Sequence, residues 1–255
     1  MKVKLIIWDL DDTLWKGTLA EGDDLELSLF RANIIRSLNN HGIVNAICSK
    51  NDFEMAKERL EQLGLWNEFV FPKISFSPKG LIVKQILEEM YLRAENTIFI
   101  DDNNMNLREV EHYVPGITTL DALGEGTDSV LQGILDDNSH INKSRMDEYR
   151  ILEEKVEKSI DFSDNDDFLA SCHIRISRVF GVHNLPHAER IEELINRTNQ
   201  LNFTKKRLSL LEVEQLINNS NLEINIIEVK DNYGDYGIVG LYALDLAKNK
   251  LEHFV

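Results

Sequence analysis

Short apolar runs alternate with segments of helical periodicity along the first half of the chain. Runs at Leu5–Trp8, 43–48 and 97–100 have the length of strands that are buried on both faces. The segments between them repeat apolar residues at three- and four-residue spacing, which predicts helices. Strands that alternate with helices form parallel sheets with right-handed crossovers. The pattern therefore predicts a doubly wound α/β unit.

Turn and capping residues bound these predicted elements. Gly42 and Gly64 fit helix ends, and Asp52 fits a helix start. Residues 15–27 contain glycine and acidic residues and predict a loop that forms a β-ribbon. The predicted helices lie at 29–41, 53–63, 80–92, 105–113 and 130–135, with short strands at 69–71 and 117–120.

The second half of the chain changes character near residue 136, where it becomes polar and charged. Residues 143–160 predict a solvent-exposed connecting helix, and 161–167 predict a linker with capping residues. A second unit begins near His173, with strands expected at 174–179, 222–229 and 238–246 and helices at 188–199 and 210–218. We therefore expect three parts, at residues 1–138, 139–172 and 173–255.

The first predicted strand leads directly into an acidic cluster. Asp9, Asp11 and Asp12 follow Trp8, and Thr13 adds a hydroxyl. Like charges at close range repel and raise one another's pKa values. A divalent cation removes that repulsion, and oxygen atoms are the ligands that Mg²⁺ prefers. The alternative is a solvated acidic turn after a buried strand.

Three later segments carry complementary chemistry near predicted strand ends. Ser49 follows the second strand, Lys79 opens a helix, and Asp101 and Asp102 follow the third strand. Because the carboxyl ends of parallel strands meet at one edge of a sheet, such folds bind ligands there. Each residue also has an ordinary role, since Ser49 can cap a turn, Lys79 can be a solvated surface lysine and Asp101 can be an N-cap.

In this order, the residues resemble the four motifs of the haloacid dehalogenase (HAD) phosphotransferase superfamily. Its first motif, DxDx(T/V), corresponds to residues 9–13. A closer resemblance is to FkbH-like proteins of HAD subfamily IIIC, which carry an acyltransferase-like segment after the phosphatase unit. The matching stretches are 8–15 (WDLDDTLW), 48–51 (CSKN), 99–103 (FIDDN), 195–204 (INRTNQLNFT) and 235–240 (DYGIVG).

The resemblance implies an α/β HAD core, Rossmann-like and doubly wound, without a large cap. The stretches between the motifs are too short to form a separate cap domain, so we expect an open cleft that suits macromolecular or carrier-bound substrates. A helical linker and a partial α+β domain similar to GNAT acyltransferases would follow. That fold would next supply a strand and a pyrophosphate-binding loop, and because the sequence stops at Val255 we expect a truncated acyltransferase half.

The resemblance also implies a Mg²⁺-dependent phosphatase acting on a phosphorylated substrate. Phosphoryl transfer requires a nucleophile, neutralised charge and in-line positioning. Asp9 would attack phosphorus and form an aspartyl-phosphate, while Asp11 would protonate the leaving oxygen and later activate water. Ser49 and Lys79 would complete the catalytic set by binding the phosphoryl group.

The remaining roles concern the metal and the phosphate. The metal ligands would be Asp9, the Asp11 carbonyl and Asp101, with Asp102 and Thr13 in supporting positions. Asp102 would orient Lys79 or a water molecule on the metal. The phosphate contacts would come from Asp9, Leu10, Asp11, Ser49, Lys50 and Lys79.

Cys48 has two interpretations. A cysteine at a strand end is commonly a small buried hydrophobe. FkbH-like proteins, however, are associated with loading a glyceryl unit from 1,3-bisphosphoglycerate onto an acyl carrier protein, and this alternative would use a thioester on Cys48. Cys172 lies in the linker and is expected to pack there.

Two further alternatives come from non-enzymatic classes of protein. A receiver domain also binds Mg²⁺ with Asp, Ser or Thr, and Lys, but it needs a phospho-accepting aspartate where this chain has Cys48-Ser49. A scaffold that only binds through the site is the other alternative. The intact set of motif residues favours an enzyme over both.

The composition limits which binding partners and which cellular compartment we expect. A formal net charge of −16 and a pI near 4.9 argue against binding nucleic acid or anionic membranes. Two cysteines are too few for a disulfide framework and favour a reducing cytoplasm. No segment has the length of an apolar membrane span. We therefore expect a soluble cytoplasmic protein.

Overall fold

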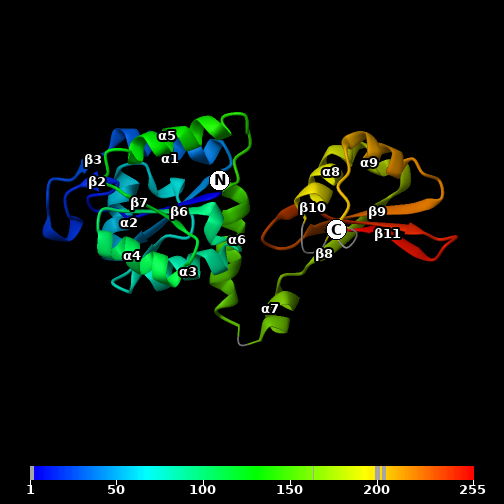
Figure 1. The fold of residues 1–255 in the computed structure, drawn as a ribbon. Coiled ribbons are helices and arrows are strands. Elements are labelled where there is room, and N and C mark those ends of the chain that lie inside the picture. The colour runs from blue at the N-terminus through cyan, green and yellow to red at the C-terminus, as the bar shows by residue number, and fades with distance from the viewer. Residues whose placement is uncertain (1–2, 163, 199–201, 203–204) are drawn as a thin grey trace. The chain divides into compact units, whose positions relative to one another are not determined.

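The computed structural model describes residues 3–162, 164–198, 202 and 205–255. The chain divides into two compact units, Met1–Glu157 and Lys158–Val255, each with its own sheet (Figure 1). No helix among the described residues is long and apolar enough to cross a membrane. The candidate chemistry of the sequence lies in the first unit.

A five-stranded parallel sheet forms the centre of the first unit. Its spatial order is β5 (Lys73–Ile74), β4 (Val44–Ser49), β1 (Leu5–Trp8), β6 (Thr97–Asp101) and β7 (Thr118–Asp121). Counted along the chain, these strands are ordered 3-2-1-4-5. Receiver-like folds have the order 2-1-3-4-5, so the receiver alternative is wrong.

Helices cover both faces of this sheet, which explains why its strands are apolar on both sides. On one face, Ile6 and Trp8 pack with residues of α1 (Leu29–Asn40), α2 (Phe53–Gln62) and α5 (Thr127–Asn138). On the other, Leu5 and Ile7 pack with residues of α3 (Lys79–Glu89), α4 (Asn104–Tyr113) and α6 (Met146–Ser159). Burial of both faces leaves the sheet edge where the strands end as the natural place for polar chemistry.

Short elements complete the first unit. The predicted ribbon forms from β2 (Trp15–Lys16) and β3 (Glu26–Leu27), and it lies directly after the acidic motif. The remaining elements are three short 3₁₀ turns, Leu19–Glu21, Trp66–Glu68 and Ala94–Asn96. Between β1 and β4 the chain holds this ribbon, one 3₁₀ turn and α1, so no separate cap domain is inserted there.

Two predictions for the first unit are wrong. The strand expected at 69–71 lies instead at Lys73–Ile74, because Phe71 has a positive φ of 50° and its N–H donates to Glu153 at 2.7 Å rather than to a strand. The helix expected to be fully exposed, α6, buries Met146 and Tyr149 in the core of the first unit.

The second unit is a four-stranded antiparallel sheet in the order β11-β10-β9-β8. Its strands are β8 (Arg175–Phe180), β9 (Leu222–Lys230), β10 (Asp235–Asp245) and β11 (Lys250–Phe254). Residues of α8 (Ala188–Arg197) and α9 (Leu210–Ile217) share a hydrophobic core with β9 and β10. The 3₁₀ turn Gly181–His187 connects β8 to α8.

Two elements of this unit were not predicted from the sequence. The strand β11 forms at the end of the chain, where we expected none, and the short helix α7 (Asn165–Ser171) forms within the predicted linker. The side chain of Asp164 caps α7 by accepting from the Asp166 N–H at 2.9 Å. In the stretch 195–204, residues 199–201, 203 and 204 lie outside the described residues, as does the predicted end of α8 at Asn199.

Candidate active site

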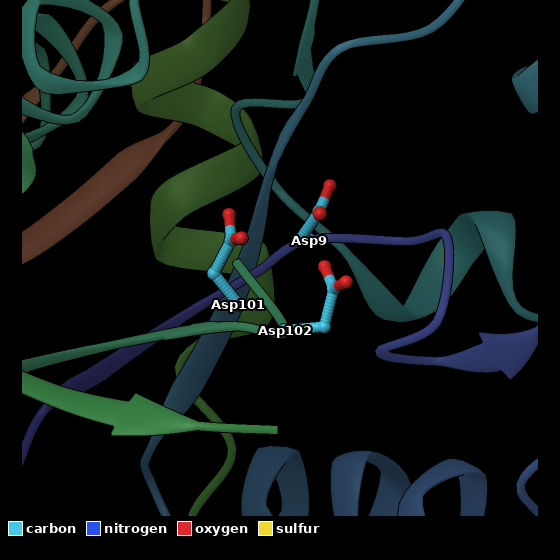
Figure 2. Close-up of side chains that lie close together, drawn as sticks. All are labelled: Asp9, Asp101 and Asp102. Atoms are coloured by element: carbon cyan, nitrogen blue, oxygen red, sulfur yellow. The ribbon is translucent and has the colours of Figure 1, made fainter. Parts of the chain in front are cut away.

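Three carboxylates meet where β1 and β6 end. Asp9 follows β1, Asp101 closes β6 and Asp102 comes next, and one oxygen from each lies within 4.8 Å of the others. Figure 2 shows the three side chains lying side by side. Asp9 is 6% exposed and Asp101 is fully buried, so two of the three charges are removed from water. Such a group needs compensating charge.

Lys79 provides part of that compensation. Its Nζ atom lies 2.7 Å from Asp9 Oδ2 and 2.5 Å from Asp101 Oδ2, and the side chain is 1% exposed. Lys79 is the first residue of α3, so the start of this helix brings the ammonium group to the carboxylates. The buried lysine therefore ties the carboxyl ends of two neighbouring strands to one helix.

Close packing of α3 against α4 determines how deeply Lys79 is buried. A Cβ atom on Gly80 would lie 2.5 Å from Tyr113 Cδ2 and 3.0 Å from the Glu109 carbonyl oxygen, so a larger residue does not fit without movement. The Gly80 N–H donates to Glu109 Oε1 at 3.0 Å. Glycine at this position lets the two helices approach and seats Lys79 next to the site.

The charges of the site shift the pKa values of its members. Burial and the neighbouring Asp101 raise the pKa of Asp9 to about 6, against the opposing effects of Lys79 and Ser49. Burial by itself lowers the pKa of Lys79, but Asp9 and Asp101 outweigh it and the net pKa is raised. Burial and Asp101 also raise the pKa of Asp102.

The donor set of the site fits a divalent cation. Three carboxylates and one ammonium group leave two uncompensated negative charges in a largely buried place. Burial first, and repulsion by Asp101 second, raise the pKa of Asp9 there. Because all the candidate ligand atoms are carboxylate oxygens, the set suits Mg²⁺ rather than a metal that prefers nitrogen or sulfur.

Two asparagines of the β6–α4 region hold Asp101. The Asn103 N–H and Asn106 Nδ2 donate to Asp101 Oδ1 at 2.9 and 3.0 Å, which leaves Oδ2 for Lys79. The side chain of Asn103 also caps α4 by accepting from the Met105 N–H. Asn106 was not predicted as a site residue from the sequence. Its position in the first turn of the helix after an aspartate pair could have indicated that it lies near the site.

Ser49 and Asn51 form the β4 side of the site. Ser49 is 1% exposed, and a hydrogen bond from its hydroxyl contributes to lowering the pKa of Asp9. Asn51 Nδ2 donates to Ser49 Oγ at 3.2 Å and to Asp11 Oδ2 at 3.1 Å. The sequence placed Asn51 within a matching motif without assigning it a role, and the structure places it between two of the predicted catalytic residues.

The Asp11 carboxylate lies outside the group of three. Its Oδ1 accepts from Trp15 Nε1 at 2.8 Å and from the Leu19 N–H at 3.1 Å, and its Oδ2 accepts from Asn51. Asp102 thus occupies the third carboxylate position of the group. The metal role predicted for Asp11 through its carbonyl stays a prediction, and no contact joins Asp102 to Lys79 among the hydrogen bonds of the described residues.

The remaining predicted residues lie around this centre. Leu10 is fully buried, and its carbonyl accepts from the N–H groups of the following turn. The Thr13 hydroxyl is buried without a hydrogen-bond partner, while the Thr13 carbonyl accepts from Arg31 Nη1 at 2.6 Å. Lys50 is exposed and its Nζ lies 3.3 Å from Asn106 Oδ1. The phosphate contacts predicted for Leu10 and Lys50, and the supporting position predicted for Thr13, stay predictions.

Cys48 points into the core rather than toward the carboxylates. Its side chain packs with the α3 and α4 side of the sheet and is fully buried. The thiol lies 3.9 Å from the Lys79 carbonyl oxygen, and burial raises its pKa. Because the thiolate is the reactive form of cysteine, this setting disfavours a nucleophilic role. Cys172 is also fully buried, and its thiol donates to the Phe168 carbonyl.

Solved structures similar to this chain are phosphatases and haloacid dehalogenase-like hydrolases. The N-terminal part of a Bacteroides fragilis protein, containing a phosphatase domain complexed with Mg, is 24% identical with a TM-score of 0.44, over 56% of this chain and 42% of that one. The 3-deoxy-D-manno-octulosonate 8-phosphate phosphatase of Moraxella catarrhalis is 18% identical with a TM-score of 0.42, over 55% and 90%. A haloacid dehalogenase-like hydrolase from Xanthomonas campestris is 13% identical with a TM-score of 0.42, over 54% and 98%.

This chain spans less than half of the length of the Bacteroides fragilis chain. No family model and no curated protein matches the sequence. Identities and TM-scores this low do not transfer an activity, so the case for function depends on the arrangement of the site residues. The finer resemblances, to FkbH-like proteins and to GNAT acyltransferases, stay predictions.

Proposed function

We propose that this chain is a Mg²⁺-dependent phosphatase of the HAD type that acts through an aspartyl-phosphate on Asp9. The observation that carries the proposal is the contact of the buried Lys79 ammonium with Asp9 and Asp101, next to a third carboxylate at the carboxyl edge of a parallel sheet. Burying these charges lowers the stability of the fold. A function at this site explains why they are nevertheless buried there. Strongly perturbed titratable groups at such an edge are typical of active sites.

We assign the metal to Asp9, Asp101 and Asp102. Mg²⁺ bound there neutralises charge, so that an anionic phosphate can approach an anionic nucleophile. The assignment adds the Asp102 carboxylate, for which the sequence predicted only a supporting position, and it does not depend on the predicted Asp11 carbonyl.

The other residues then have distinct tasks. Lys79 keeps Asp9 ionised, since its positive charge opposes the effect of burial on that carboxylate. Ser49, at the end of β4, is placed to donate its hydroxyl to a phosphoryl oxygen. The Asp11 carboxylate is held apart from the metal group. It can therefore give a proton to the leaving oxygen and later take one from the attacking water.

The substrate we propose is a phosphorylated molecule that reaches the site without a lid. The chain between β1 and β4 supplies a ribbon and a helix instead of a cap domain. Lids exclude water and grip small substrates, and a site without one receives large or carrier-bound phosphates more readily. Slow and poorly selective turnover of small phosphates is therefore expected.

The glyceryl-loading alternative gains no support from the surroundings of Cys48. A thioester requires a thiolate that meets the acyl donor, whereas this thiol is fully buried and its pKa is raised. An acyl carrier protein consequently has no specific observation in its favour. The β8-α8-α9-β9-β10-β11 order of the second unit supports its proposed likeness to the first half of a GNAT fold.

Trapping of the phosphoryl group tests the proposed function. The protein is incubated with para-nitrophenyl phosphate and Mg²⁺, quenched in acid, digested and examined by mass spectrometry. We expect Mg²⁺-dependent phosphate release and a phosphoryl adduct on the peptide that contains Asp9. Release that survives chelation of Mg²⁺, or an adduct on a peptide without Asp9, would overturn the proposal.

A further inference from the structure

Asn51 is a buried amide that joins two predicted catalytic side chains. Its side chain follows the end of β4 and the residue is 2% exposed. The same nitrogen, Nδ2, donates to Asp11 Oδ2 at 3.1 Å and to Ser49 Oγ at 3.2 Å. Asp11 comes from the loop after β1, so one amide group connects the ends of two adjacent strands.

The chemistry of the partners fixes the direction of both hydrogen bonds. Asp11 Oδ2 accepts from Asn51 Nδ2, so the NH₂ group of the amide faces Asp11. An amide NH₂ group has two hydrogens, and here one serves Asp11 and the other serves Ser49. Because a hydroxyl has a single hydrogen, a Ser49 oxygen that accepts from Asn51 directs its own O–H elsewhere. That hydrogen is then available to Asp9, whose pKa a side-chain hydrogen bond from Ser49 lowers.

We propose that Asn51 is a positioning residue that orients the Asp11 acid and the Ser49 hydroxyl at the same time, an inference that rests on the proposed phosphatase function. Asn51 holds one carboxylate oxygen of Asp11 while Trp15 and the Leu19 N–H hold the other. Loss of the amide therefore frees Oδ2 of Asp11 and lets the Ser49 hydroxyl rotate. Asn51 itself exchanges no proton with the substrate.

This role predicts a dependence on the leaving group. Hydrolysis of an alkyl phosphate needs a general acid because an alkoxide is a poor leaving group, whereas para-nitrophenolate leaves without protonation. A misplaced Asp11 therefore impairs the alkyl ester more than the aryl ester. A residue that served only stability would reduce both rates by the same factor.

The first experiment measures kcat for ethyl phosphate and for para-nitrophenyl phosphate in two variants, Asn51→Ala and Asn51→Asp. The Asn51→Asp change keeps the side-chain volume but removes both N–H donors. We expect kcat for the ethyl ester to fall by about a hundredfold and for the aryl ester by about threefold. The matched control is Asn45→Ala, which removes a fully buried amide of β4 that bonds to Trp8 and Asn39. In the control we expect equal factors for both esters.

The second experiment does not require turnover. Calorimetry measures the affinity of the full chain for inorganic phosphate in saturating Mg²⁺. We expect Asn51→Ala and Ser49→Ala each to weaken phosphate binding by about tenfold, and the double variant to weaken it by little more than either one. If the wild type hydrolyses neither ester, the proposed activity fails while this measurement still decides the role of Asn51. Equal loss on both esters, or an unchanged phosphate affinity in Asn51→Ala, overturns the inference.

Discussion

Two lysine–aspartate pairs, one in each unit of the chain, lie in opposite environments. In the first, Lys79 and Asp101 form an ion pair in which neither side chain is more than 1% exposed. In the second, the Lys230–Asp235 pair has a similar separation of 2.6 Å, but its side chains are 58% and 54% exposed. The two pairs are alike in distance and differ in contact with water.

The exposure of each ion pair to water decides how much the pair contributes to stability. A surface pair adds little to stability because water and salt screen it. A buried pair costs several kcal/mol in desolvation, and removing one partner leaves an uncompensated charge. The comparison teaches that the first unit tolerates a local cost in stability at its carboxyl edge, which is typical of functional sites. Four changes test this contrast.

The largest expected effect is on catalysis. Asp9→Asn preserves the shape of the nucleophile but removes its charge, so phosphate release should fall by about three orders of magnitude or more. Steady-state assays with an aryl phosphate measure this. The control is Asp235→Asn in the second unit, which should keep the wild-type rate. Full activity in Asp9→Asn would remove the basis of the assignment.

The next effect is on stability. Lys79→Met leaves Asp101 buried without its cation, so the first unit should lose about 3–5 kcal/mol of unfolding free energy in metal-free buffer. The equivalent Lys230→Met should lower the stability of the second unit far less, because water and salt screen that exposed pair. Tryptophan fluorescence in urea follows the first unit alone, because Trp8, Trp15 and Trp66 all lie there, and far-UV circular dichroism follows the unfolding of both units. Similar losses in the two variants would mean that the buried pair is not special.

A smaller effect identifies the third metal ligand. Asp102→Asn should weaken Mg²⁺ binding at least about tenfold, which corresponds to roughly 1.4 kcal/mol. Asp11→Asn should change it by less than about threefold, since that carboxylate is bound by Trp15, the Leu19 N–H and Asn51 instead. Calorimetric titration with MgCl₂ measures both. The reverse order of effects would assign the third carboxylate of the metal group to Asp11 instead of Asp102.

The smallest effect concerns Cys48. Cys48→Ala removes a small buried side chain, so we expect a loss of about 1 kcal/mol in stability and phosphatase activity within about tenfold of wild type. A thiol reagent should label neither Cys48 nor Cys172 until the protein is unfolded, because both are buried. Rapid labelling of Cys48 in the folded protein, or an acyl adduct on it, would support the thioester alternative instead.

Much of the first unit could be predicted because its pattern is local. The apolar runs at β1, β4 and β6 lead directly to Asp9, Ser49 and Asp101, and the helices between them carry regular spacing. The misplaced β5 shows the limit of such reasoning. The apolar residues Phe69 and Phe71 do lie in the core, but as irregular backbone that a contact with distant Glu153 stabilises.

The sequence predicts which residues form the site better than it predicts how those residues are arranged. Sequence spacing puts Asp11 and Asp102 equally near the site, and nothing local says which carboxylate joins the group. The answer comes from Trp15 on the ribbon and Asn51 after β4, which hold Asp11 by contacts between separate loops. The buried face of α6 was likewise visible only once the chain was folded, whereas the sequence did indicate capping residues at 161–167, where Asp164 caps α7.

The central position of β1 has a consequence for how the chain is made. Leu5 pairs with Val44 on one side and with Thr97 on the other, so the second neighbour is synthesised roughly ninety residues later. At about 5–20 residues per second, the ribosome takes roughly 5–20 seconds to supply it. During that interval the first strand leaves the N–H and C=O groups of one edge unpaired, and Asp9 lacks Asp101 beside it. The nascent chain is therefore a natural client for chaperones until β6 has emerged.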